Sequence, residues 1–161
     1  MPEIRALASS DVAAVLEMNN AAVPAVNPHD ATSLAQLLTI ADKAWVVDHS
    51  GVLGGLLVVF APGAPYASRN YEWLSERYEN FGYVDRIVVA PMHRRMGLAA
   101  KLYEEFASHA RVAGADRLLC EVNVDPPNPQ SIAFHEANGW TAIDDLEHGP
   151  GKVVRFFERR L

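Results

Sequence analysis

The hydrophobic pattern along the chain changes between the two-residue period of strands and the four-residue spacing of helices. The clearest helix follows Gly97, where Leu98, Leu102, Phe106 and Ala110 recur every four residues and form one apolar stripe. The strand candidates are short β-branched runs bounded by turn residues. The pattern predicts strands over Ile4–Leu7, Ala44–Asp48, Val52–Phe60, Gly82–Ala90, Arg117–Val124, Trp140–Leu146 and Lys152–Glu158, and helices from Ser9 and over Asp30–Ile40, Gly97–Ala113 and Asn128–Ala137.

The order of these elements predicts one α/β domain over residues 1–161, with a sheet of mixed strand direction. A length of 161 residues suits one domain, and no linker divides the pattern. Residues 61–80 interrupt it with prolines and aromatic residues. We expect a long loop there, with one helical turn over Glu72–Tyr78.

Composition and charge narrow the possible partners. The net charge of −6 argues against a nucleic-acid partner and favours a cationic or neutral substrate. The single cysteine, Cys120, fits a reducing compartment. The longest apolar run, Val52–Ala61, has about half of the ~20 residues that a membrane helix needs, and the N-terminus lacks an apolar signal core. We expect a soluble cytoplasmic protein with no membrane partner.

The segment Tyr83–Ala100 has the features of an anion site. An apolar strand ends at Pro91, and a basic turn then leads into the N-terminus of a long helix, where free backbone N–H groups and the helix dipole attract negative charge. Gly97 allows close approach, and the arginines before it donate to phosphates. The P-loop and dinucleotide patterns are both absent. Taken alone, the segment is either a pyrophosphate site or a basic turn that merely starts a helix.

The wider context resembles the cofactor motif of the GNAT acetyltransferases, Gln/Arg-x-x-Gly-x-Gly/Ala. Arg94, Gly97 and Ala99 match it in register, and Val89-Ala90-Pro91 precedes it as in that superfamily. A second block, Asn128–Trp140, looks like the superfamily's Asn-x-x-Ala/Ser-x-x-Leu/Phe-Tyr-x-x-x-Gly-Phe. The resemblance is strong over residues 81–143. It implies a GNAT-like fold, a mixed and mostly antiparallel sheet flanked by helices on both faces.

The resemblance also implies acetyl-CoA as cofactor, with no metal. Backbone N–H groups of the cofactor loop would hold the pyrophosphate, and the strand before it would offer backbone hydrogen bonds to the pantetheine arm, as an added strand does. Asn128 would lie near the pantetheine, or would simply cap its helix. The implied cofactor residues are Ile87, Val88, Val89, Arg94, Arg95, Met96, Gly97, Leu98, Ala99, Ala100 and Asn128.

One position of the second block departs from the family. Where the family often has a tyrosine that protonates the leaving thiolate, this chain has His135. A thiolate of pKa about 8.5 needs only a modest acid, and an imidazolium near 6.5 is adequate. Our hypothesis is that His135 is this acid or a hydrogen-bond donor to the thioester sulfur. The alternative is a helix histidine held by packing and one hydrogen bond.

A general base is also needed, because only a neutral amine attacks a thioester. Asp85, on the strand before the cofactor loop, is the candidate; a structural salt bridge or a turn cap is the alternative. Strand alternation places Asp85 with Tyr83 and Ile87, and Arg86 on the other face. Glu121 and Asn123 on the next strand are rivals. For the acceptor pocket we expect Asn20, Tyr83 and Asn123, with Asn19, Tyr71, Trp73 and Tyr78 as further candidates.

The resemblance implies an N-acetyltransferase that moves an acetyl group from acetyl-CoA to a primary amine by direct attack, without a covalent enzyme intermediate. The acidic net charge of the chain leads us to expect the amine of a small molecule. Two alternatives stay open. One is a non-catalytic acyl-CoA-binding sensor of the same fold, and the other is a domain that binds a different nucleotide. A homodimer is possible, with Lys152–Glu158 as an edge strand for pairing.

Overall fold

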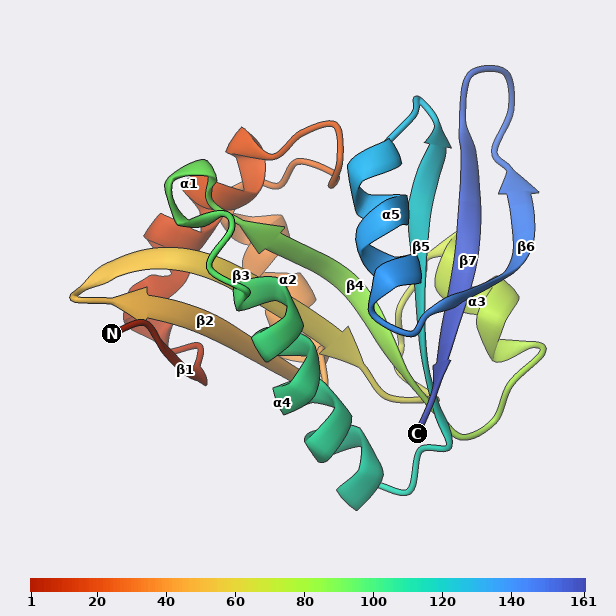
Figure 1. The fold of residues 1–161 in the computed structure, drawn as a ribbon, viewed down its shortest axis with the longest axis horizontal. Helices are drawn as coiled ribbons and strands as arrows, with labels where there is room; N and C mark the ends of the chain where they lie inside the picture. The colour runs from red at the N-terminus through yellow and green to blue at the C-terminus, as the bar shows by residue number, and fades with distance from the viewer.

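The computed structural model describes residues 1–161 as a seven-stranded sheet with five α-helices (Figure 1). The strands are β1 (Glu3–Ala6), β2 (Lys43–His49), β3 (Val52–Phe60), β4 (Phe81–Val89), β5 (Arg117–Asp125), β6 (Thr141–Glu147) and β7 (Val153–Arg160). The helices are α1 (Val12–Ala21), α2 (Ala31–Ile40), α3 (Arg69–Ser75), α4 (Leu98–Val112) and α5 (Pro129–Ala137), with short 3-10 turns η1 (Ser9–Asp11) and η2 (Pro91–His93).

The strands run in the order β1-β2-β3-β4-β5-β7-β6, and every neighbouring pair is antiparallel except β4 and β5. The predicted mixed, mostly antiparallel sheet is therefore confirmed. The prediction that the final strand forms an edge is wrong, because β7 inserts between β5 and β6 and hydrogen-bonds to both. The edge on that side is β6.

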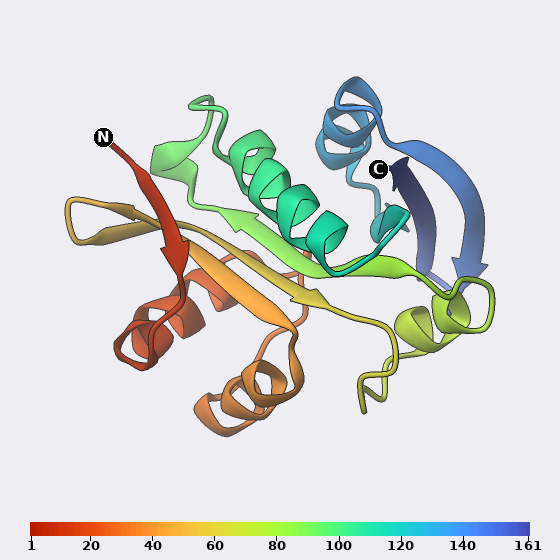
Figure 2. The ribbon, with the colours of Figure 1, turned by 90° about the horizontal axis from the view of Figure 1, so that it is seen from below.

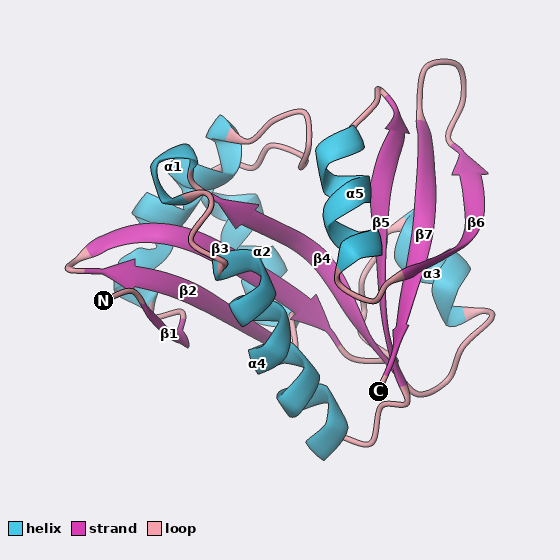
Figure 3. Cartoon of the chain, in the orientation of Figure 1, coloured by secondary structure: helices cyan, strands magenta, loops and turns pink.

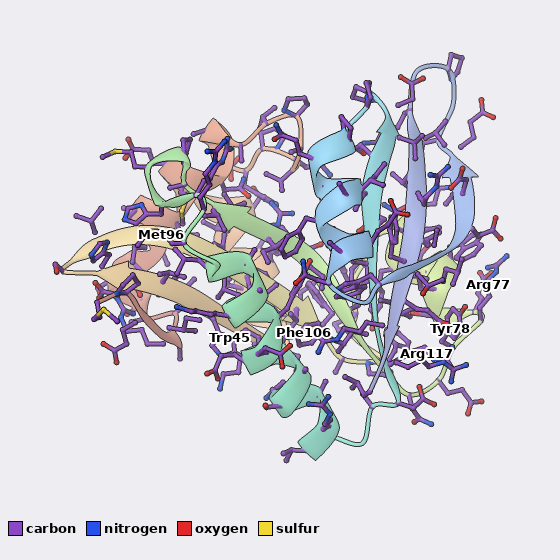
Figure 4. All side chains as sticks on the ribbon, in the orientation of Figure 1. Trp45, Arg77, Tyr78, Met96, Phe106 and Arg117 are labelled. Carbon is purple, nitrogen blue, oxygen red and sulfur yellow. The ribbon has the colours of Figure 1, made fainter.

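Helices cover both faces of the sheet (Figure 2). One core lies under α4 and α5, and the other lies under α1, α2 and α3. Strand alternation divides the side chains between them: on β5, Leu118 and Cys120 face the first core, whereas Leu119 faces the second. Trp45 packs against Phe106 of α4 with ring centroids 6.2 Å apart (Figure 4). The apolar stripe predicted for α4 is thus the face that it buries.

β4 and β5 separate soon after they meet, as the diverging ribbons in Figure 1 show. Their parallel pairing covers only Phe81, Gly82 and Tyr83 of β4. Just beyond, the register between β3 and β4 shifts, because Val59 pairs with Val84 and Val58 with Arg86. Asp85 is the extra residue of this β-bulge, and a bulge bends and twists its strand. The remainder of β4 therefore presents an unpaired edge toward β5.

The segment predicted as a loop contains more helix than expected. The expected turn at Glu72–Tyr78 is the helix α3 over Arg69–Ser75, and the Ser68 hydroxyl accepts a hydrogen bond from the backbone N–H of Tyr71 at 3.3 Å. Serine is a favourable N-cap because it satisfies one of the free N–H groups of the first turn. α3 covers the sheet beside β7, and its start is close to the opening between β4 and β5.

Candidate functional site

The loop before α4 presents a row of free backbone donors. None of the N–H groups from Arg95 to Ala100 donates a hydrogen bond within the protein; Lys101 is the first to do so, to the carbonyl of Gly97 at 3.1 Å. Arg95 and Gly97 have positive φ values of 63° and 70°. This backbone conformation makes the turn that leads the chain, with its free N–H groups, into α4. Arg94, Arg95 and Met96 are exposed, and the arginines form no ion pair. This loop can hold a pyrophosphate.

A cavity of about 80 Å³ lies between the diverging strands β4 and β5, on the side of α5. Ile87 and the unpaired edge of β4 form one wall, and Asn128 and Ser131 of the α5 segment form the other. Asn128 precedes α5, but its side chain makes no capping hydrogen bond, so its amide remains available to a ligand. A chain-like ligand in this opening would meet unpaired strand backbone on one side and the Asn128 amide on the other.

His135 lines this cavity together with Tyr103 of α4. The Nδ1–H group of His135 donates to the Ser131 carbonyl at 2.7 Å, and Nε2 accepts from the Tyr103 hydroxyl at 2.8 Å. Burial lowers the pKa of His135, which is only 3% exposed, and the bond to Ser131 opposes this effect. The neutral imidazole therefore already uses both nitrogens. Tyr103 is the group with a rotatable proton beside the cavity.

A second cavity, of about 110 Å³, lies on the opposite side of the same opening. The loop between α1 and α2 closes it, and Figure 3 shows this loop reaching toward the gap between β4 and β5. Asp85, Arg86, Glu121 and Asn123 line both cavities, so the two meet at the bulge in β4. A donor from one face and an acceptor from the other would meet at these residues.

Asp85 and Arg86 form a buried ion pair, with Nε to Oδ2 at 2.7 Å and each side chain 4% exposed. The expectation that Arg86 points to the other face is wrong, because the bulge at Asp85 interrupts strand alternation and turns Arg86 toward α1. There its guanidinium donates to Asn19 Oδ1 at 2.8 Å and to the Asn27 carbonyl at 3.2 Å. Tyr66 donates its hydroxyl hydrogen bond to Asp85. The carboxylate predicted as general base is therefore held by two partners.

Glu121 has no cationic partner. Its carboxylate accepts a hydrogen bond from the Tyr83 hydroxyl, and it is partly open to both cavities. Burial raises the pKa of Glu121 to about 7, with a further contribution from Asp85 and an opposing one from Tyr83. A carboxyl group that titrates near neutral pH, at the junction of two cavities, suits a general base. Of the two carboxylates considered, Glu121 has the better geometry for this role.

The structure separates the other predicted acceptor residues. Tyr83 and Asn123 line the second cavity, but Asn20 lines neither and instead fixes the α1–α2 loop, with its amide donating to the His29 carbonyl at 2.8 Å. One step along α1 rotates a side chain by about 100°, so the neighbouring Asn19 is buried and Asn20 is exposed.

The aromatic candidates of the predicted loop serve packing. Trp73 stacks on Phe156 at 4.4 Å, Tyr78 lies under the Arg117 guanidinium at 4.6 Å, and Tyr71 accepts from the Ala64 N–H at 3.0 Å. Neither cavity is lined by these three side chains. The site residues that sequence reasoning missed are Tyr66, Tyr103 and Lys152. Of these, only Tyr103 could have been found from the sequence, because it is a tyrosine on the inward face of an amphipathic helix.

The largest cavity, of about 580 Å³, lies between α1 and the ends of β3 and β4. It contains neither Glu121 nor His135, and we place the chemistry at the smaller paired cavities, where the titratable groups converge. No group of three or more histidine, cysteine or acidic side chains is arranged to hold a metal ion. No helix has the length and apolar character to cross a bilayer.

Comparisons with known proteins agree with this geometry. A proposed acetyltransferase of the GNAT family from Desulfovibrio desulfuricans superimposes with a TM-score of 0.80 at 15% identity, covering 99% of each chain. The ribosomal-protein-S18-alanine N-acetyltransferase from Escherichia coli gives 0.77 at 16% identity, covering 99% of this chain and 94% of its own. YncA from Salmonella typhimurium, a proposed acetyltransferase solved with acetyl-CoA, gives 0.73 at 19% identity, with coverage of 99% and 94%. At these identities the likeness shows the fold.

The family assignment comes from the sequence itself. No curated protein matches the chain. The model of the acetyltransferase (GNAT) family, whose members use acetyl-CoA, matches residues 14–140, which include the cofactor loop and the whole second block. The chain therefore belongs to the acetyltransferase (GNAT) family.

Proposed function

We propose that this protein is an N-acetyltransferase that transfers an acetyl group from acetyl-CoA to the primary amine of a small molecule by direct attack. The observation that carries the proposal is the opening between β4 and β5, at which two cavities from opposite faces of the sheet share Asp85, Arg86, Glu121 and Asn123. Direct transfer needs the donor and the acceptor in one place, and no covalent enzyme intermediate is required.

The residues of the cofactor side fit acetyl-CoA. The free N–H groups of residues 95–100 suit a pyrophosphate, and a side chain built at Gly97 would meet no protein atom within 4 Å. The unpaired edge of β4 and the Asn128 amide suit the amide groups of a pantetheine arm. When bound, acetyl-CoA supplies the acetyl group as a thioester.

Two groups of the chain handle protons at the opening. Glu121 receives the proton that the amine must lose, because its carboxyl group titrates near neutral pH and lies at the junction of the cavities. The Tyr103 hydroxyl lies beside the cofactor cavity and donates to His135 Nε2. Turned from Nε2 toward the cavity, this O–H group donates a hydrogen bond to the leaving thiolate, and His135 positions the hydroxyl instead of acting as the imidazolium acid that the sequence suggests.

The size of the acceptor cavity supports a small acceptor. Its volume is about 110 Å³, and the α1–α2 loop, the segment before α3 and the start of β7 enclose it. Polar side chains form most of its wall, so an amine with further polar groups suits it better than an apolar one.

Thermal unfolding with acetyl-CoA, CoA, ATP and NAD tests the cofactor site first. At 100 times its dissociation constant a ligand adds about 2.7 kcal/mol, or several degrees for a chain of this size. Gly97→Glu should abolish the shift, because its carboxylate repels a pyrophosphate. Gly114→Glu is the matched control, since Gly114 also has positive φ (91°), has no neighbour within 4 Å of a built side chain, and lies at the far end of α4. It should lower the melting temperature and keep the shift.

Release of free thiol with a panel of amines then tests turnover. Stabilisation by acetyl-CoA together with thiol release supports the enzyme. Stabilisation without thiol release on any amine would instead indicate a non-catalytic acyl-CoA-binding module. Stabilisation by ATP or NAD and not by acetyl-CoA would overturn the proposal.

A further inference from the structure

Lys152 is an unpaired cation in the wall of the acceptor cavity. It precedes β7, and its Nζ donates to the Asn123 side-chain oxygen at 2.7 Å. It forms no ion pair with any carboxylate. An ammonium group has three donors, and the only hydrogen bond that Lys152 Nζ makes is the one to Asn123. Its remaining donors are available to a ligand in the cavity.

Two further basic side chains lie near Lys152. The His148 ring bonds to the Asn70 side chain at 2.8 Å, and Asn70 lines the cavity. The pKa of His148 is lowered by burial and also by the positive charges of Arg69 and Lys152, so these groups lie within electrostatic reach of one another. Arg69 is exposed and unpaired. This side of the cavity therefore attracts an anionic group and repels a second cation.

Glu121, in the wall of the same cavity, supplies the group that an amine needs. Glu121 and Asn123 are two residues apart on β5 and point to the same face, at roughly 7 Å along the strand. Glu121 carries the carboxyl group, and Asn123 holds Lys152. The amine nitrogen and carboxylate oxygen of an α-amino acid are separated by about 3 Å. With a hydrogen bond of about 2.9 Å at each end, such a molecule reaches about 9 Å, which exceeds the spacing of roughly 7 Å between Glu121 and the Asn123 that holds Lys152.

The other charges of the cavity do not alter this balance. Asp85 is neutralised by Arg86 within a buried pair, so neither charge is free to select a substrate. The net charge of −6 describes the whole chain and predicts a cationic acceptor, but the charge that an acceptor meets in the cavity is that of Lys152 and its neighbours. The local charges therefore favour an acceptor with a negative group beside its amine.

We propose that the acceptor is a free amino acid, whose α-amine faces Glu121 and whose carboxylate is bound by Lys152. This inference rests on the proposed acetyl transfer and names the class of acceptor. It excludes polyamines, whose second cation would lie against Lys152. It also excludes a peptide N-terminus, in which an amide replaces the carboxylate.

Matched acceptors and matched variants test whether the acceptor is a free amino acid. The panel contains free L-amino acids whose side chains are small, large, polar or apolar. Each amino acid is compared with the amine that lacks its carboxylate and with its amide. We expect kcat/KM to be about 10- to 100-fold higher for the amino acid of each set, as for one charge-assisted hydrogen bond. Lys152→Met should remove this preference through KM, Lys152→Arg should largely retain it, and Lys43→Met on β2 is the control. Calorimetric binding of the amino acids without acetyl-CoA gives a second readout.

The outcomes separate the two proposals. Equal turnover of amines, amides and amino acids, or an equal loss for all three in Lys152→Met, overturns the amino-acid acceptor and leaves acetyl transfer standing. Amino-acid binding that Lys152→Met weakens at least 10-fold, without turnover of any acceptor, keeps the carboxylate site and overturns the proposed function. If the protein neither binds amino acids nor turns over any acceptor, both proposals are overturned.

Discussion

Replacing Glu121 by glutamine removes the one carboxylate of the acceptor cavity that has no cationic partner. In the folded protein its pKa is about 7, against 4.5 for the free group, so the fold favours the protonated form. Full ionisation corresponds to about 3 kcal/mol, and because Glu121 is only partly buried, solvent screening reduces this to about 2 kcal/mol. The contribution of Glu121 to stability is complete below pH 4.5, falls as the pH rises, and is lost above about pH 7.

Glu121→Gln should therefore be as stable as the wild type near pH 4.5 and more stable by about 2 kcal/mol at pH 8. Urea unfolding at both values measures the difference, which should appear in the midpoint with an unchanged slope. The hydrogen bond from Tyr83 is retained, because a glutamine oxygen also accepts it. Glu105→Gln is the control, since Glu105 is exposed on α4 and should give the same small effect at both pH values.

The same variant should be nearly inactive. Loss of a positioned base lowers turnover by about 10²- to 10⁴-fold. In the wild type, kcat/KM should rise with pH through an apparent pKa near 7, and in Glu121→Gln this limb should be absent. A variant that retains the limb would show that another group takes the proton, and equal stability at pH 8 would show that the buried carboxyl is not perturbed as the structure implies.

Two further substitutions test the surroundings of the opening. Tyr103→Phe removes the hydroxyl beside the cofactor cavity and leaves His135 Nε2 unpaired. In steady-state kinetics, kcat should fall about 10- to 100-fold with little change in the KM for acetyl-CoA. An unchanged kcat would remove Tyr103 from the mechanism. Gly82→Ala should destabilise the fold by about 1–3 kcal/mol, because a side chain there would come within 2.7 Å of the Phe106 ring. A thermal midpoint equal to that of the wild type would contradict the packing between β4 and α4.

The cofactor side could be predicted from the sequence because its causes are local. Gly97 is required by a positive φ directly before a helix, and the free N–H groups are those of the loop and the first helical turn. The element order also follows from short-range periodicity, and the predicted bounds differ from the observed ones by only a few residues. The placement of Asn128 beside the opening follows from its position directly before α5.

The acceptor side could not be predicted in the same way, because it depends on contacts between distant parts of the chain. Strand alternation predicts the wrong face for Arg86, because alternation fails at a bulge that only the pairing with β3 reveals. Lys152 reaches Asn123 across 29 positions of sequence. Tyr103 and His135 come from different helices, and a histidine in the motif gave no indication of which group it would orient.

The bulge at Asp85 connects these features. One extra residue in β4 bends the strand away from β5 and turns Arg86 toward the same face as Tyr83. The first effect opens the sheet, so that a cavity on each face reaches Glu121. The second effect brings a guanidinium to Asp85 and neutralises it. Had β4 remained regular, Arg86 would point to the other face, and the cavity would hold two unpaired carboxylates and favour a cationic acceptor. With the bulge, Glu121 is left to receive a proton and Lys152 to select the acceptor, so an irregularity of one residue sets both the access to the site and its charge.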